Sequence, residues 1–151
     1  EGLTKVADAA HSLGLHAVQL HGRESAGYIE TLKASLPQHC EIWAAGAVGV
    51  EVPPARPGAD RTLFDTSVAG RSGGTGRTFD WSRLNGRGDL GRGILAGGLR
   101  PDNARRASGV GAFALDVGSG VEMAPGRKDA GKLHAFFDAL RPAKRGEPLP
   151  C

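Results

Sequence analysis

The sequence predicts an α/β fold built on a parallel sheet, and three observations support this class. Short apolar runs alternate with helical patterns at spacings of roughly 20 to 30 residues, which is typical of βα units. Three of these runs stop at a compact polar or glycine-rich turn, namely residues 63–66 (LFDT), 94–99 (ILAGGL) and 113–120 (FALDVGSG). Each turn follows an expected buried strand, and enzymes with parallel sheets place their chemistry at the carboxyl ends of the strands.

The first part of the chain alternates helix and strand. Apolar residues at helical spacing predict a helix over residues 3–13, with Gly14 as its stop, and a second amphipathic helix over residues 24–36. Apolar runs predict strands over residues 16–20 and 41–48. The proline-rich stretch that follows is expected to be a loop.

The second part continues the alternation. Strands are predicted over residues 62–66, 93–96 and 112–117, a short helix opens near Trp81, and further helices are predicted over residues 101–107 and 128–140. Proline at the first position favours the helix over residues 101–107. We expect residues 1–141 to form the folded domain and residues 142–151 to be a disordered tail.

Composition excludes several classes of protein. The chain has 151 residues, 40% hydrophobic and 23% charged, so it is long enough for one core but short for a (βα)8 barrel of ~250 residues. A net charge of +3 and an aromatic content of 5% do not indicate nucleic-acid binding. No run approaches the ~20 apolar residues that a membrane-spanning helix needs. A small anionic substrate fits this composition.

The two cysteines, Cys40 and Cys151, show no metal-ligand spacing and no disulfide framework. This pattern favours a reducing compartment, and we expect a cytoplasmic protein without a membrane partner. The chain begins without methionine inside a predicted helix, so we interpret it as part of a longer protein.

Two aspartates are candidates for acid–base or substrate-binding roles. Asp65 follows an apolar strand, where partial desolvation raises the pKa of a carboxyl group toward the range of a general acid. A helix N-cap or turn role explains Asp65 equally well. Asp116 alternates out of an apolar run and either binds substrate hydroxyls or accepts a backbone hydrogen bond. His21, after Gln19, contacts substrate or acts as a capping residue.

Glycines in two successive turns predict an anion site. Gly97 and Gly98 follow one strand, and Ser119 and Gly120 follow the next. Tight turns alone explain either pair, but two such turns together favour a phosphate held by bare N–H groups. The glycine-rich segment 70–76 lacks the Gly-Lys-Ser/Thr ending of a P-loop, so a flexible loop over a ligand or a plain surface loop remain as interpretations.

Several of these segments occur together in the order of one known family. Residues 17–22 (AVQLHG), 73–81 (GGTGRTFDW), 95–99 (LAGGL) and 116–129 (DVGSGVEMAPGRKD) resemble phosphoribosylanthranilate isomerase over most of the chain. The intervening sequence, notably 28–32 and 81–86, is similar to the version fused behind indole-3-glycerol-phosphate synthase in some bacteria.

The resemblance implies a (βα)8 barrel, of which this chain holds about strands four to eight. It also implies an Amadori rearrangement in tryptophan biosynthesis, in which N-(5′-phosphoribosyl)anthranilate becomes 1-(2-carboxyphenylamino)-1-deoxyribulose 5-phosphate without a metal or organic cofactor. Asp65 matches the family's general acid. The phosphate-binding positions match Gly97, Gly98, Ser119 and Gly120, and the substrate-binding positions match Gln19, His21 and Asp116.

The chain departs from the family in three places. The family's general base is a cysteine in an early Lys-Ile-Cys-Gly segment that this chain lacks, and neither Cys40 nor Cys151 is placed to substitute for it. The early arginine that meets the anthranilate carboxylate is absent, and Ala44 stands where relatives often carry lysine. We therefore expect this segment alone to be inactive, and a non-catalytic phosphate-binding half-barrel is the alternative.

Overall fold

The computed structural model describes residues 2–68, 71–72 and 78–141. Five parallel strands form one sheet in chain order: β1 (Ala17–Leu20), β2 (Glu41–Val48), β3 (Arg61–Val68), β5 (Ile94–Leu95) and β6 (Ala114–Leu115). A short strand, β4 (Arg71–Ser72), pairs antiparallel with the end of β3. Each parallel strand lies beside its successor, which is the winding of a barrel and not the reversed order of a doubly wound sheet. The predicted α/β class with a parallel sheet is confirmed.

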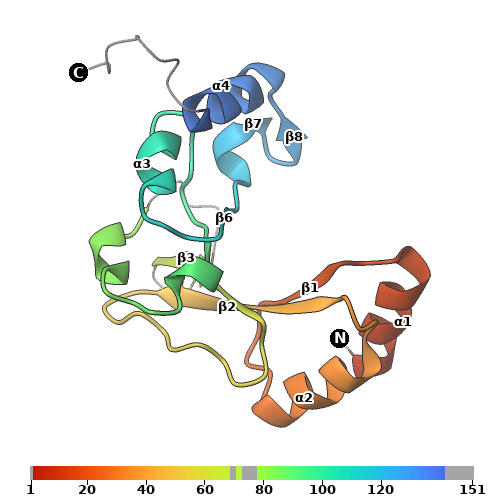
Figure 1. Cartoon of the computed structure of the whole chain (residues 1–151). Coiled ribbons are helices and arrows are strands. Elements are labelled where there is room, and N and C mark those ends of the chain that lie inside the picture. The colour runs from red at the N-terminus through yellow and green to blue at the C-terminus, as the bar shows by residue number, and fades with distance from the viewer. Residues whose placement is uncertain (1, 69–70, 73–77, 142–151) are drawn as a thin grey trace.

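The described residues also form four α-helices and three 3₁₀ segments. The helices are α1 (Leu3–Leu13), α2 (Ala26–Ser35), α3 (Ala104–Ser108) and α4 (Ala130–Leu140), and the 3₁₀ segments are η1 (Trp81–Leu84), η2 (Leu90–Arg92) and η3 (Ser119–Val121). In Figure 1, α1 and α2 lie at one end of the described chain beside β1, and α3 and α4 lie at the other end. None of the helices within the described ranges has the length and apolar character needed to cross a membrane.

The helices pack against one face of the sheet. In register, Gly46 of β2 lies beside Phe64 of β3, which lies beside Leu95 of β5. Phe64 and Leu95 belong to a buried cluster with residues of η1, α3 and α4, while Ile42 of β2 packs with α1 and α2 in a second cluster. The opposite face carries a smaller cluster of Leu63, Ile94 and Ala96. Helices thus cover one face of this sheet, as they cover the outer face of a barrel, and the other face corresponds to the barrel's interior.

Three predicted helix starts are wrong, and side-chain hydrogen bonds explain all three. The helix predicted from residue 128 begins at Ala130, because the Asp129 carboxylate caps it. The second helix begins at Ala26 because the Ser25 hydroxyl accepts a hydrogen bond from the Tyr28 N–H at 3.2 Å, which caps the helix. The helix predicted from residue 101 begins at Ala104 instead, so Pro101 is not its first residue. Here Asn103 binds the preceding turn with its side chain and holds residues 101–103 outside the helix.

A short hairpin precedes the last helix and was not predicted. Strands β7 (Glu122–Ala124) and β8 (Arg127–Lys128) pair antiparallel, and the Lys128 Nζ lies 2.9 Å from the Glu122 Oε1. The hairpin leads into α4, where the Asp129 carboxylate accepts a hydrogen bond from the Lys132 N–H at 2.9 Å. Three-residue and two-residue strands leave too little periodicity for sequence patterns to reveal them.

Candidate active site

A pocket of about 120 Å³ opens at the carboxyl ends of β3, β5 and β6. Six of the predicted site residues line it: Asp65, Gly97, Gly98, Asp116, Ser119 and Gly120. The pocket brings the two predicted aspartates and both predicted glycine turns together, although they lie as much as 55 positions apart in the chain. Residues 70 and 73–76 of the glycine-rich segment, and the predicted tail 142–151, lie outside the described residues.

Asp65 lies within β3, and not at the strand's end as the sequence predicted, because β3 continues to Val68. Its side chain is half-buried, and its Oδ1 accepts a hydrogen bond from the Thr66 N–H at 2.7 Å. Burial raises the pKa of the Asp65 carboxyl group, the Thr66 N–H and the charge of His21 lower it, and the charge of Asp116 raises it. The result is a pKa above the ordinary value for aspartate. A carboxyl group of this kind keeps its proton to higher pH than an exposed one.

The other polar residues stand at the ends of β6 and β1, each two strands away from β3 in the sheet. Asp116 directly follows β6 and is exposed, and its N–H donates to the Leu95 carbonyl at 2.8 Å. Gln19 and His21, at the end of β1, are exposed and do not line the pocket, but their side chains contact each other through Nε2 atoms 2.5 Å apart. The charge of His21 nevertheless lowers the pKa of Asp65.

The turn after β5 requires glycine at Gly97. Its φ of +81° lies in the left-handed region, and an added Cβ would lie 2.6 Å from the Asp65 Oδ1 and 2.4 Å from the Thr66 Oγ1. The Thr66 hydroxyl oxygen is buried without a hydrogen-bond partner in the described structure. The glycine backbone thus lies directly against the carboxyl group of Asp65, where a bulkier residue would displace it.

The turn after β6 lies directly against the turn after β5. A Cβ added to Gly120 would lie 1.7 Å from the Leu99 carbonyl oxygen. Among the described residues, no hydrogen bond uses the backbone N–H of Gly98, Ser119 or Gly120. Bare N–H groups on two adjoining turns are suited to a phosphate, which accepts several hydrogen bonds at once.

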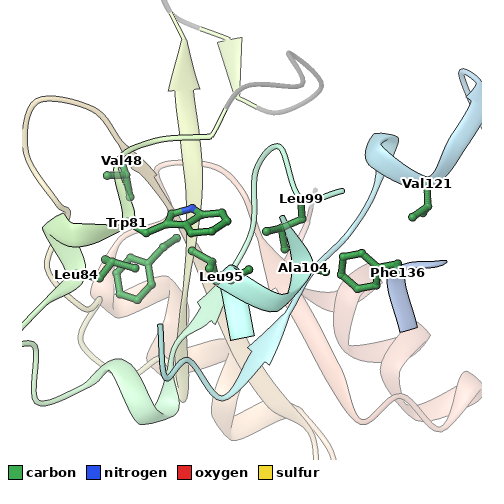
Figure 2. Close-up of a cluster of buried hydrophobic side chains, with 10 residues drawn as sticks. Val48, Trp81, Leu84, Leu95, Leu99, Ala104, Val121 and Phe136 are labelled. Carbon is green, nitrogen blue, oxygen red and sulfur yellow. The ribbon is translucent and has the colours of Figure 1, made fainter. Parts of the chain in front are cut away.

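Buried side chains anchor both turns from below. Figure 2 shows Leu99, which follows the first glycine turn, and Val121, which follows the second, in the same buried cluster as Leu95 and Phe136. Leu99 is 2% and Val121 is 1% exposed. Each turn is therefore fixed to the core by the residue that directly follows its glycines.

Asn103 holds the first glycine turn, a role that we did not assign from the sequence. Its buried side chain donates to the Gly98 carbonyl at 3.0 Å and accepts from the Arg100 N–H at 2.9 Å. Side-chain amides carry both a donor and an acceptor, so a single asparagine closes this turn. Asn103 stands five positions beyond Gly98, so the two partners are close in the sequence.

Replacing Asn103 with alanine is expected to destabilise the folded protein by about 1–3 kcal/mol, because it leaves the Gly98 carbonyl without a partner. Urea unfolding measures this loss. The KM for a phosphorylated substrate should rise as the turn loosens. Asn103→Asp keeps the acceptor for the Arg100 N–H but places a carboxylate oxygen against the Gly98 carbonyl, so its effect on stability should be at least as large.

No group of three or more His, Cys, Asp or Glu side chains within residues 2–68, 71–72 and 78–141 is arranged to hold a metal ion. Cys40 is buried and precedes β2, so it lies at the opposite end of the sheet from the pocket, as expected. Burial raises the pKa of the Cys40 thiol, which keeps it in its protonated form.

The family model described as N-(5′-phosphoribosyl)anthranilate (PRA) isomerase matches residues 1–139 of the sequence. The chain belongs to this family. It is 49% identical over 138 residues to the tryptophan biosynthesis protein TrpCF of Vibrio cholerae, covering 91% of this chain and 29% of that protein. It is 38% identical over 154 residues to N-(5′-phosphoribosyl)anthranilate isomerase of Magnetococcus marinus, covering 95% of this chain and 68% of that protein. The chain thus spans under a third of the length of the TrpCF relative.

Solved structures of PRA isomerases share the fold. The enzyme of Thermus thermophilus matches with a TM-score of 0.73 at 29% identity, over 93% of this chain and 68% of that one. TrpF of Jonesia denitrificans matches with a TM-score of 0.69 at 34% identity, over 92% of this chain and 66% of that one. A PRA isomerase in complex with reduced 1-(o-carboxyphenylamino)-1-deoxyribulose 5-phosphate matches with a TM-score of 0.67 at 28% identity, over 92% of this chain and 66% of that one.

Proposed function

We propose that this chain supplies strands four to eight of a (βα)8 PRA isomerase of tryptophan biosynthesis. Membership of the family supports the activity, and five parallel strands in chain order support the assignment of strands. The solved relatives are longer than this chain, which covers 68% of the Thermus thermophilus enzyme. In the full-length protein, three further strands would pair with the edges of β1 and β6.

The observation that carries this proposal is the pocket that joins Asp65 to two glycine turns. The substrate, N-(5′-phosphoribosyl)anthranilate, carries a phosphate at one end of its ribose and an amine at the other. A phosphate held at Gly98, Ser119 and Gly120 would leave the furanose ring beside Asp65 and Asp116. No cofactor is invoked for this rearrangement.

Asp65 acts as the general acid in this proposal. It donates its proton to the ring oxygen as the bond from that oxygen to C1′ breaks, and the nitrogen lone pair forms the C1′=N bond of a Schiff base. A general base, supplied by the part of the protein before this chain, then removes the C2′ proton, and the resulting enolamine tautomerises to the ketone. The pKa of Asp65 is raised in the direction that suits this step, because a general acid must carry a proton before it can donate one.

His21, Gln19 and Asp116 contact the substrate from the rim in the same proposal. TrpCF relatives favour a further partner: a covalently fused indole-3-glycerol-phosphate synthase that precedes this chain. The substrate is a small phosphorylated molecule in the cytoplasm, and neither nucleic acid nor a membrane takes part.

Turnover of N-(5′-phosphoribosyl)anthranilate by the full-length protein tests the function. Loss of the substrate's fluorescence, with the aminoketose product identified by mass spectrometry, is the expected result. Binding of inorganic phosphate without turnover would contradict the isomerase and support the alternative, a phosphate-binding protein without catalysis.

A further inference from the structure

Arg56 joins the loop after β1 to the loop after β2. Its Nη1 donates to the Glu24 Oε2 at 2.8 Å, and its Nη2 donates to the carbonyls of Gly22 and Ala45, the latter at 3.5 Å. The other oxygen of Glu24, Oε1, accepts from the Gly22 N–H at 3.0 Å. Arg56, Glu24 and Gly22 therefore form a closed ring of hydrogen bonds, which we call the Arg56 clamp.

The clamp is partly shielded from water. The Arg56 side chain is 27% and the Glu24 side chain is 23% exposed, unlike the fully solvated ion pairs that contribute little. Burial raises the pKa of Glu24, but hydrogen bonds from backbone N–H groups and from Arg56 outweigh it, so the pKa lies below its ordinary value. Glu24 is therefore ionised at neutral pH, as a charge-assisted bond to the guanidinium requires.

His21 directly precedes the clamped residue Gly22, so the clamp fixes the backbone on which the imidazole stands. His21 contacts Gln19, and its charge acts on Asp65. The groups that act on Asp65 are the Thr66 N–H, His21 and Asp116. Thr66 is on the same strand as Asp65, whereas Asp116 and His21 each directly follow a strand. Of these two, His21 precedes a residue that the clamp holds.

We propose that Arg56 is a positioning residue for the isomerase reaction: its clamp on Glu24 and Gly22 holds His21 at the rim facing Asp65. The proposal rests on the proposed function of this site. Arg56 acts through His21 and contacts no reacting atom. An arginine is suited to this position because its planar fork reaches a carboxylate and two carbonyls at once, which an ammonium on a flexible stem does not do in the same geometry.

The test compares variants of the full-length isomerase. Arg56→Ala is expected to lower kcat/KM about 10- to 100-fold, the range that a small misplacement of a catalytic group produces. Arg56→Lys should restore little of the loss. The matched control is Arg83→Ala, because Arg83 donates to the Gly49 and Val50 carbonyls at 3.2 and 2.6 Å on the same side of the sheet without touching the loop of His21. The control should keep the wild-type kcat/KM.

The pH profile separates positioning from stability. If His21 moves away, the pKa of Asp65 rises, so the alkaline limb of kcat/KM should shift to higher pH in Arg56→Ala. The double variant Arg56→Ala/His21→Ala should be no slower than His21→Ala alone, because the two substitutions disrupt the same interaction, that of His21 with Asp65. An unmoved alkaline limb, or equal losses with and without His21, would overturn the proposal.

Two further measurements keep the test decisive. If Arg56→Ala fails to fold, Glu24→Gln weakens the clamp while keeping its shape, and a smaller shift of the alkaline limb in the same direction is expected. NMR signals of the His21 imidazole report its position without activity, and they should shift in Arg56→Ala but not in Arg83→Ala. A wild-type protein that does not turn over contradicts the proposed function, whereas unchanged His21 signals contradict the clamp.

Discussion

Replacing Asp65 with asparagine is expected to lower kcat of the full-length isomerase by about 10²–10⁴-fold, the usual loss when a general acid is removed. The amide has nearly the shape of the carboxyl group, and it still accepts the hydrogen bond from the Thr66 N–H. It has no acidic proton to donate to the ring oxygen, so ring opening becomes slow. Single-turnover fluorescence measurements check this step directly.

The same substitution is expected to stabilise the folded protein at neutral pH. Because the folded-state pKa of Asp65 is raised above its ordinary value, folding disfavours the ionised form. Below the ordinary pKa of aspartate, Asp65 is protonated in both the folded and the unfolded state and does not lower the free energy of unfolding. As the pH rises through the raised folded-state pKa, Asp65 lowers this free energy progressively. Asp65→Asn removes that cost, so urea unfolding at pH 7 should have a higher midpoint than for the wild type.

Asp138→Asn is the matched control for both measurements. Asp138 lies on α4, is 61% exposed and pairs with Arg141 at 2.7 Å, away from the pocket. It should leave kcat unchanged, and it should change the free energy of unfolding by no more than a few tenths of a kcal/mol. Full turnover by Asp65→Asn would show that another group donates the proton.

The parallel sheet was predictable because its strands are apolar on both faces and end at abrupt turns. The segment 41–48 and the helix 3–13 were located at their observed bounds, and Gly14 ends that helix with a φ of 60°. Residues 24 and 25 were assigned to the second helix, although its apolar face begins only at Tyr28. In the folded chain, Glu24 instead bonds to Gly22 and Arg56, and Ser25 caps the helix.

The pocket residues were also predictable, but what positions them was not. The glycines of both turns follow strand ends, and Asp65 follows an apolar pair inside β3, and sequence patterns mark both kinds of position. Arg56 lies 32 positions from Glu24, and such a pairing has no local signature. The close approach of Gly120 to Leu99 is similarly invisible in the sequence, because a glycine required by tertiary contact resembles a glycine required by a turn.

Because Gly120 lies so close to Leu99, Gly120→Ala is the second substitution for which we expect a large effect. A methyl group at Gly120 would lie 1.7 Å from the Leu99 carbonyl oxygen and 2.8 Å from its carbonyl carbon, so the two glycine turns must separate. Forcing an extra methyl group into a packed site costs ~1–3 kcal/mol. If this cost falls on phosphate binding, KM rises about 10- to 100-fold. The expected kcat changes less, because Asp65 stands on β3 and not on either turn.

Competition by inorganic phosphate distinguishes this effect from general unfolding. Its inhibition constant should rise in parallel with KM in Gly120→Ala, while a substrate analogue without the phosphate is unaffected. Gly88→Ala is the control, since a Cβ there meets nothing within 4 Å. An unchanged inhibition constant in a folded Gly120→Ala protein would mean that the anion does not sit between these turns, and the glycines would then serve only the close packing of the chain.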